Sequence, residues 1–339
     1  MRAIARLLVL CLSLPCLPAF AENLATLYQV REAVASQQPE ARDQGIQRAL
    51  DTLLMRLTGN RNAAQNPALA ALRKDPQQVI GQYGYEGDVL VVDFDPVSTD
   101  RSLRQAGLPL WGTNRPSVLV WWLNETAEGA NLLGDGQDAA KPVRDAGEHR
   151  GLPLRLPLAD LSEQLVATPA ALEAAQPDAL RPVSERYAAD ALLAVHAREE
   201  NGAWRAQWRL WLGEQPEQGI AEAANGVALA DAVMLAVSER LAPRFVVAPG
   251  AASSLTLEVQ GADLGRYAEL DRVLEPFGAR LTRVEGDRLT YQVNASAEQL
   301  RAQLALVHLQ EVGADSPPAE GAPQPAAQPA PTGVLRFRW

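Results

Sequence analysis

Two neighbouring carboxylates are the first residues whose types and spacing could do chemistry. Asp93 and Asp95 lie two positions apart at the end of the apolar run VLVVDF. Because residues two apart share one side of a strand, such oxygens could bind a hard cation or act as an acid and a base. No further ligand is identifiable, however. We therefore expect Asp93 to end a strand and Asp95 to enter a turn before Pro96.

A second polar group lies in residues 144–151, RDAGEHRG, and includes Glu148, His149 and Arg150. One interpretation is an active-site or recognition loop, because loops often carry function. The other, which the sequence favours, is a solvated connection. If the protein were a hydrolase, Glu148 and His149 would be the candidates here, beside the two carboxylates above.

Motifs typical of common enzyme classes are missing. His149, His196 and His308 are far apart, and none has the HExxH spacing of a zinc site. The chain contains no G-x-S-x-G, no S-x-x-K and no phosphate-binding G-x-x-x-x-G-K-[ST] sequence. His196 lies in an apolar strand pattern and is expected to be a core histidine with hydrogen-bond partners. We predict no catalytic residue, no metal ligand and no cofactor, and we favour a non-enzymatic protein without excluding an enzyme.

The first 21 residues have the features of a secretory signal peptide. Arg2 and Arg6 are followed by an apolar segment and by the small-x-small sequence Ala19–Ala21. This pattern predicts export to the periplasm and cleavage after residue 21. No later segment approaches the roughly 20 apolar residues that a membrane span requires.

The predicted mature chain is acidic and free of cysteine. Both cysteines, Cys11 and Cys16, lie inside the signal peptide, so neither a disulfide nor a thiolate site is expected afterwards. A lipoprotein modified at Cys16 is disfavoured, because Pro15 stands where that processing requires a small residue. Without Arg2 and Arg6, the basic residues fall from 31 to 29 against 41 acidic ones, a net charge of −12. Such a charge argues against nucleic acid as a partner.

The order of predicted elements indicates an α+β protein built from tandem small α/β domains. Hydrophobic periodicity and turn signals define these units. Pro39 and Gly59 mark the start and end of a predicted helix, and Ser296 with Gln299 forms a capping-box pair at the start of another. The Leu/Pro segment RGLPLRLPLADL is expected to lie along a sheet edge or over the core, with Asp160 capping the helix that follows. The third has the order β-α-β-β-α-β, which is typical of a ferredoxin-like domain. The predicted divisions are a signal peptide (1–21), an N-terminal α/β domain (22–110), a central α/β domain (111–250), a ferredoxin-like domain (251–312), a flexible Pro/Ala-rich linker (313–333) and a terminal strand (334–339).

Three tryptophans surround one apolar run in WGTNRPSVLVWW. Trp121 and Trp122 are adjacent, so in a strand they face opposite sides and cannot line one groove. We expect both to be core residues if helices cover both faces of the sheet. Trp111 and Arg115 lie on the preceding connection, and these residue types are enriched at interface hot spots. Core packing remains the favoured alternative for Trp111.

The carboxyl-terminal tail is a second candidate for binding. Leu335, Phe337 and Trp339 alternate with arginines, and such a peptide can add a strand to a partner's sheet. The alternative, which we favour, is that the tail folds back onto the chain's own third domain. The residues predicted to contact a partner are therefore Trp111, Arg115, Arg150, Leu335, Phe337 and Trp339.

Four segments in order resemble a bacterial envelope family known as domain-of-unknown-function family 2066. That family has no assigned reaction, so the resemblance implies no catalytic residue. The middle region is also loosely similar to TolB amino-terminal-like α/β domains, which bind other envelope proteins. The segments that carry the resemblance are WG-x-x-RP-x-VLVWW, RGLPLRLPLADL, RYAADALLAV and the W-x-x-x-W strand at 204–208.

Absent motifs, several domains and a tethered apolar tail together favour a non-enzymatic periplasmic protein. We expect it to bind another, unidentified envelope protein as an accessory factor. Two other classes remain open. One is a carboxylate-dependent hydrolase, and the other is a glycan or peptidoglycan-binding protein that uses exposed tryptophans.

Overall fold

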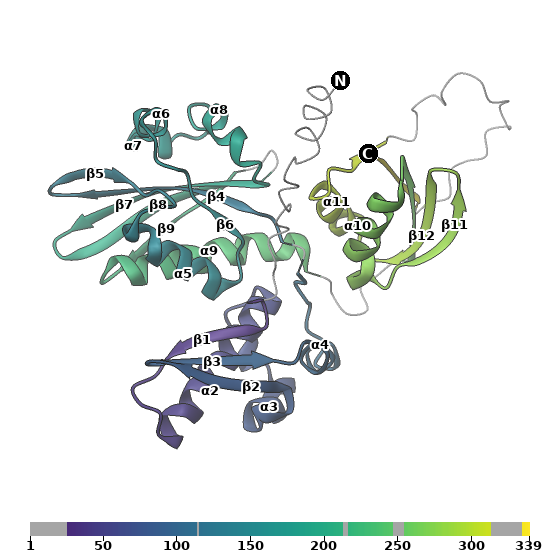
Figure 1. The fold of residues 1–339 in the computed structure, drawn as a ribbon, viewed down its shortest axis with the longest axis horizontal. Helices are drawn as coiled ribbons and strands as arrows, with labels where there is room; N and C mark the ends of the chain where they lie inside the picture. Colours follow the sequence, from purple (N-terminus) through teal and green to yellow (C-terminus); the bar gives the residue numbers. More distant parts are fainter. Residues whose placement is uncertain (1–25, 114, 213–215, 247–253, 313–333) are drawn as a thin grey trace, which may run out of the picture.

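The computed structural model describes residues 26–113, 115–212, 216–246, 254–312 and 334–339. Three β-sheets follow one another along the chain, each packed against helices (Figure 1). This arrangement confirms the predicted α+β class. The predicted signal peptide (1–21) and the predicted linker (313–333) lie outside the described residues. Among the described helices, none is long and apolar enough to cross a membrane.

The first unit is an antiparallel sheet of order β1-β3-β2 covered by one long helix. Pro39 begins that helix and Gly59, in the left-handed conformation, ends it, as the sequence predicts. The helix buries Ile46, Leu50 and Leu53 against the sheet. The elements are β1 (Gln29–Ala33), α2 (Pro39–Thr58), α3 (Ala70–Lys74), β2 (Ile80–Glu86), β3 (Val89–Phe94) and α4 (Pro96–Gln105).

The central unit is a mixed sheet of order β5-β4-β7-β8-β9, with the short β6 also beside β4. Helices α6, α7 and α8 lie over one face, while α5 and α9 lie over the other (Figure 1). The strands are β4 (Val118–Thr126), β5 (Gly129–Leu132), β6 (Leu154–Arg155), β7 (Ala191–Glu200), β8 (Ala203–Trp211) and β9 (Pro216–Ala223). The helices are α5 (Lys141–Arg150), α6 (Leu161–Val166), α7 (Pro169–Leu172), α8 (Arg181–Ser184) and α9 (Gly226–Phe245).

Because helices cover both faces of this sheet, both of the paired tryptophans are buried. Trp121 packs into the core beneath α6 to α8, and Trp122 packs into the larger core beneath α5 and α9. The indole Nε1 of Trp121 donates to Ser184 at 3.0 Å, and that of Trp122 donates to Asn124 at 2.7 Å. Both are therefore core residues on opposite faces, as predicted.

One predicted loop is wrong. Residues 144–151 were expected to be a connection, but most of them form the second half of α5. Gly147 weakened the helical pattern in the sequence. In the structure this glycine serves the packing of one element against another. A Cβ at Gly147 would lie 2.2 Å from the Leu154 Cδ1 atom, so glycine lets α5 pack closely against β6. The αL residue Gly151 ends the helix.

The third unit contains the predicted elements, but its sheet has an unexpected order. Its elements are β10 (Ser254–Gln260), α10 (Leu264–Leu274), β11 (Arg280–Glu285), β12 (Arg288–Asn294), α11 (Ala297–Ala305), β13 (Gln310–Glu311) and β14 (Val334–Arg338). The sheet order is β11-β12-β10-β14-β13. The tail strand β14 therefore folds back, as favoured. It inserts between β10 and β13 rather than extending an edge, and so departs from a simple ferredoxin-like sheet.

Candidate functional site

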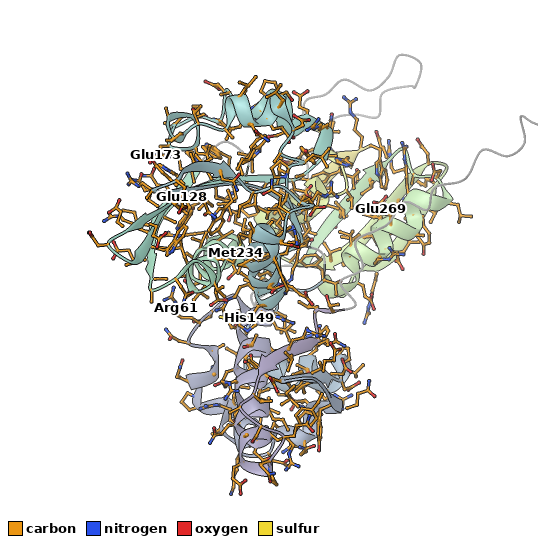
Figure 2. The ribbon with its side chains drawn as sticks, turned by 60° about the vertical axis from the view of Figure 1, so that its left-hand side comes forward. Arg61, Glu128, His149, Glu173, Met234 and Glu269 are labelled. Carbon is orange, nitrogen blue, oxygen red and sulfur yellow. The ribbon has the colours of Figure 1, made fainter. Side chains whose placement is uncertain are left out.

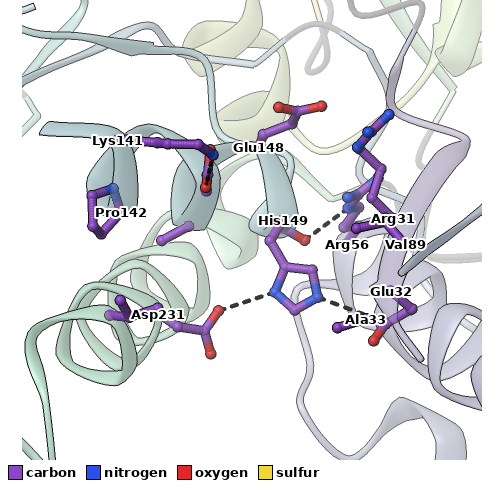
Figure 3. Close-up of a pocket in the computed structure, with 13 residues that line it drawn as sticks. Arg31, Glu32, Ala33, Arg56, Val89, Lys141, Pro142, Glu148, His149 and Asp231 are labelled. Atoms are coloured by element: carbon purple, nitrogen blue, oxygen red, sulfur yellow. Dashed lines mark hydrogen bonds and ion pairs between the residues drawn. The ribbon is translucent and has the colours of Figure 1, made fainter. Parts of the chain in front are cut away.

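A cleft separates the first sheet from helices α5 and α9. Its volume is about 490 Å³, and its walls come from β1, the end of α2, the start of β3, α5 and the start of α9 (Figure 3). Charged side chains of both signs line it, including Arg31, Glu32, Lys141, Glu148 and Asp231. Because the walls belong to two units of the fold, the groups between them decide how firmly those units are joined.

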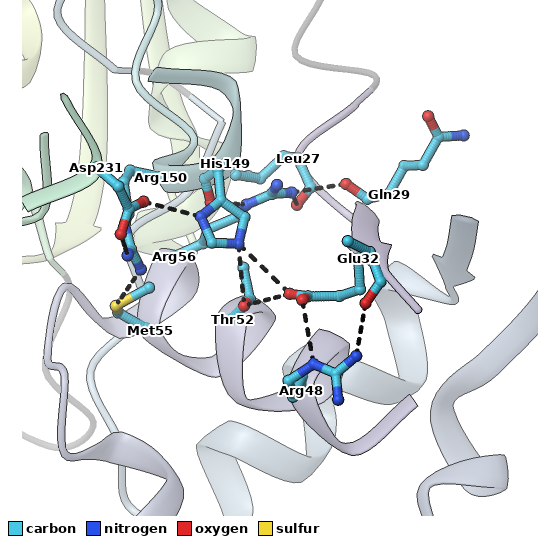
Figure 4. Close-up of polar contacts among 11 residues, drawn as sticks. Leu27, Gln29, Glu32, Arg48, Thr52, Met55, Arg56, His149, Arg150 and Asp231 are labelled. Atoms are coloured by element: carbon cyan, nitrogen blue, oxygen red, sulfur yellow. Dashed lines mark hydrogen bonds and ion pairs between the residues drawn. The ribbon is translucent and has the colours of Figure 1, made fainter. Parts of the chain in front are cut away.

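His149 joins the two walls of this cleft. Its Nδ1 lies 3.0 Å from Asp231 Oδ1, on α9 of the central unit. Its Nε2 lies 3.4 Å from Glu32 Oε1 on β1 and 3.4 Å from Thr52 Oγ1 on α2, both in the first unit (Figure 4). The imidazole ring thus bridges two carboxylates that belong to different units, Glu32 on β1 and Asp231 on α9.

The surroundings of His149 favour the protonated ring. Hydrogen bonds to Asp231 and then to Glu32 raise the pKa of His149 above its ordinary value, although burial opposes them. Its place in the last turn of α5 adds the negative end of that helix dipole. Burial alone would raise the pKa values of Glu32 and Asp231, but the hydrogen bonds from His149 and its neighbours lower both.

The contacts around His149 do not prepare Thr52 as a nucleophile. The Thr52 hydroxyl donates to Glu32 Oε1 at 2.9 Å, so its proton is directed to the carboxylate and away from the ring. A protonated His149 has no free lone pair with which to accept a proton. Thr52 is also buried. The arrangement therefore acts as an ionic link between the two units.

Two buried arginines strengthen the same interface. Arg56 of α2 donates to the carbonyl oxygens of His149 at 2.8 Å and of Gln29 at 2.6 Å. Arg115 donates to the carbonyl oxygens of Arg56 at 2.7 Å and of Gly151 at 2.9 Å. Burial lowers the pKa of Arg56 to about 10 and that of Arg115 to about 9, so both remain charged at neutral pH. Backbone carbonyls from both units thus converge on two buried cations.

The sequence-predicted residues Trp111, Arg115 and Arg150 all lie in this interface and are buried. The Arg115 guanidinium lies 4.2 Å from the centroid of the Trp111 ring, which stacks on Phe245 of α9. Arg150 forms an ion pair with Asp231. These three side chains therefore join units of the same chain and are covered in this conformation, so they offer no surface to a partner.

The three tail residues predicted to contact a partner lie elsewhere, in the third sheet. Leu335 and Phe337 are buried in its core, and the Trp339 ring lies 5.5 Å from the Arg266 guanidinium. They do not meet the residues of the cleft. In this conformation their partner is the chain's own β10, with which β14 pairs in parallel.

The paired carboxylates at the end of β3 have separate structural roles. Asp93 accepts hydrogen bonds from the Gln29 and Gln82 amides at 2.7 and 2.8 Å. Asp95 caps α4 by accepting from the Ser98 backbone N–H at 2.8 Å. Neither carboxylate lines the cleft that contains His149. The strand ends at Phe94, close to the predicted position, but the predicted turn is instead the start of helix α4, for which Asp95 is the N-cap.

His196 is a buried histidine with both ring nitrogens bonded, as expected. Its Nδ1 and Nε2 atoms each lie 2.7 Å from a carboxylate, of Glu173 and Glu125 respectively. Figure 2 labels Glu173, a partner of His196, and also His149, and the two lie well apart in that view. Among the described residues, no group of three or more His, Cys, Asp or Glu side chains is arranged to hold a metal ion.

An exposed apolar surface at α6 was not predicted from the sequence. Leu158, Leu161 and Leu165 are 66%, 73% and 71% exposed. Leu161 and Leu165 are four residues apart and share one face of α6, and Leu158 lies just before its N-cap. We call these three residues the leucine ridge. Helix α6 lies on the opposite face of the central sheet from α5 and α9 (Figure 1).

Hydrogen bonds and an ion pair beneath the leucine ridge hold α6 in place. Asp160 and Glu163 form a capping box at the start of α6, as Asp160 was expected to do. Glu163 is fully buried, pairs with Arg186 and accepts a hydrogen bond from the Tyr187 hydroxyl at 2.5 Å. The Leu158 backbone N–H donates to the same hydroxyl at 2.8 Å. The leucines are therefore held outward by the structure beneath them.

Comparison with known proteins gives one match. Residues 21–112 match the model of a family described as a domain of unknown function (DUF8605). This segment contains β1 to α4. No curated protein and no solved structure matches the chain. The resemblance to domain-of-unknown-function family 2066 is therefore wrong, because the matching family is a different one, and nothing supports a TolB-like relationship.

Proposed function

We propose that the chain is a non-enzymatic factor of the bacterial cell envelope that binds another protein through its leucine ridge. The observation that carries this proposal is the exposure of Leu158, Leu161 and Leu165 on a firmly anchored helix. Export rests on the signal-peptide pattern of the first 21 residues.

The exposure of the ridge is unusual for a surface that only meets water. Single exposed apolar residues are common, but a cluster on one element marks a site of interaction. Polar groups border this cluster, among them Ser162, Gln164 and the Asp160–Arg186 ion pair. An apolar centre with a polar rim is the usual composition of a protein interface. Because α6 is already fixed, little ordering is needed on binding.

The two alternative functions have less support. A hydrolase would need its acid and base in one cleft, but Asp93 and Asp95 lie outside the cleft of His149, which is itself engaged with two carboxylates. A glycan-binding protein would need exposed aromatic platforms. All seven tryptophans lie in the described residues, and each is buried or half-buried. Protein binding is the class that the surface favours.

The test compares capture of envelope proteins by two double variants with equal loss of apolar surface. Leu161→Ser with Leu165→Ser removes the two ridge side chains that lie on α6. The control, Val97→Ser with Leu264→Ser, removes two other exposed side chains, which are 65% and 85% exposed. We expect the ridge variant to lose the protein that the wild-type chain and the control retain. Equal retention by both variants, with unchanged melting temperatures, would contradict the proposal.

A further inference from the structure

The tail strand occupies a position between two other strands of the third unit. Residues 254–312 supply a β-α-β-β-α-β order of their own, ending in β13. β14 pairs in parallel with β10 and antiparallel with β13. β13 therefore already runs antiparallel to β10 and is separated from it by one strand.

The contacts of the tail are all made within that unit, among the described residues. Five residue pairs join β14 to β10, from Thr256 and Val334 to Gln260 and Arg338. Arg336 forms an ion pair with Glu258 at 3.1 Å, and its carbonyl oxygen accepts from the Val312 N–H at 2.8 Å. The tail is thus recognised as a short extended peptide.

The side chains of the tail show what this position selects. Leu335 and Phe337 are buried beside Leu257 and Val259 of β10. The intervening Arg336 faces a glutamate, and Trp339 lies against Arg266. The recognised pattern is therefore an extended segment with apolar residues at alternate positions and a basic residue between them.

From this arrangement we propose that the position between β10 and β13 is a strand-binding slot. The chain's own tail fills it, and it accepts an extended segment of a partner protein with the same alternating pattern. Backbone pairing supplies affinity and the buried alternate side chains supply specificity, as in other cases of β-strand addition. This inference concerns residues other than the leucine ridge, so it stands or fails separately from the proposed function.

The tail is a strong competitor because it is tethered. The segment between Val312 and Val334 contains 21 residues (313–333), and a tether of this length gives an effective concentration of order 1 mM. A free peptide of equal intrinsic affinity should therefore bind the intact chain more weakly than a chain without its tail. The factor is about the ratio of the effective concentration to the tail's dissociation constant, which is tenfold for a constant of about 0.1 mM and larger for a tighter one. A partner must bind more tightly than the tail or be held nearby by another contact.

Fluorescence polarisation with a labelled peptide of residues 334–339, VLRFRW, tests the slot. The peptide is titrated into the full chain, a chain ending at Gly333, and the Phe337→Ser and Leu264→Ser variants. We expect the chain without its tail and the Phe337→Ser variant to bind at least about tenfold more tightly than the full chain and the Leu264→Ser control. A peptide carrying serine in place of Leu335 and Phe337 should not bind. Equal binding by full and shortened chains would overturn the proposal, as would no binding by a shortened chain that remains folded.

A second form of the protein covers the case in which the shortened chain unfolds. A protease site placed in residues 313–333 allows the full chain to be cut after folding, which leaves the tail seated without its tether. We expect labelled VLRFRW to exchange into the slot of the cut chain and not into the uncut one. Absence of exchange in the cut chain over days would overturn the proposal.

Discussion

Protonation of His149 should stabilise the contact between the first and central units. The perturbation is His149→Gln, which keeps one amide donor and removes the charge. In the wild-type chain the protonated ring forms two charge-assisted contacts, at 3.0 Å to Asp231 and 3.4 Å to Glu32. Such bonds contribute about 1.5–3 kcal/mol each when well formed. Because the second is long and the side chain is 31% exposed, we expect about 2 kcal/mol in total.

The direction of the pH dependence follows from the raised pKa of His149. A group with a higher pKa in the folded state binds its proton more tightly there. Its stabilisation is fully present below the unfolded pKa of about 6.5 and is lost as the pH rises through the higher folded value. The lowered pKa values of Glu32 and Asp231 act in the opposite direction, but in a more acidic range.

Thermal unfolding between pH 5.5 and 8.5 measures this effect. We expect His149→Gln to melt lower than wild type by roughly 4–8 °C at pH 5.5, with a gap that narrows as the pH rises. Glu148→Gln is the matched control, since it removes a charge from the preceding residue of α5, whose side chain lines the same cleft, and should leave the pH profile unchanged. A gap that is constant, or that widens with pH, would refute the proposed ionic link.

Three further substitutions test other contacts, each by denaturant unfolding. Gly59→Ala should lower the free energy of unfolding by about 2–3 kcal/mol, because its Cβ would lie 1.8 Å from the Ala242 Cβ of α9. Gly87 is also left-handed but faces open space, so Gly87→Ala should lower it by about 1 kcal/mol. Equal losses would contradict the close approach of Gly59 to α9. Glu163→Ala should lower the free energy of unfolding by about 3 kcal/mol and weaken partner capture, because it leaves Arg186 and Tyr187 beneath α6 without their carboxylate. A stable variant with normal capture would show that these contacts are dispensable. Arg115→Lys should lower the free energy of unfolding by about 2 kcal/mol, because lysine cannot replace the planar guanidinium that lies over Trp111. An unchanged free energy of unfolding would argue against a stabilising role for this guanidinium.

Local patterns in the sequence were sufficient for most elements. The helix from Pro39, the buried β4 with tryptophans on opposite faces, and the cap at Asp160 all depend on near neighbours in the chain. The capping box of Ser296 and Gln299 is also present at α11. Periodicity, proline position and capping side chains act over a few residues, so they predict such elements directly.

The candidate sites depended on contacts that no local pattern encodes. Glu32, Thr52, His149 and Asp231 lie on four elements of two units, and nothing in their spacing indicates that they meet. The tail strand was correctly expected to fold back, but its position depends on a gap between β10 and β13 that only the folded sheet defines.

The leucine ridge was missed for a different reason. The segment around Leu158 alternates leucine with proline, and we expected it to follow a sheet edge or cover the core. Exposure of its leucines depends on whether another element covers them. The hydrophobicity of a side chain can be read from the sequence, but whether another element buries that side chain depends on the fold.

Residue-specific photo-crosslinking is the most direct test of protein binding through the leucine ridge. A photoreactive phenylalanine analogue is placed at Leu161, and in a parallel chain at Val97, and both are irradiated in intact envelopes. The account predicts one discrete crosslinked protein from position 161, none from position 97, and loss of the crosslink when Leu165→Ser is added. No crosslink from position 161, or the same products from both positions, would contradict it.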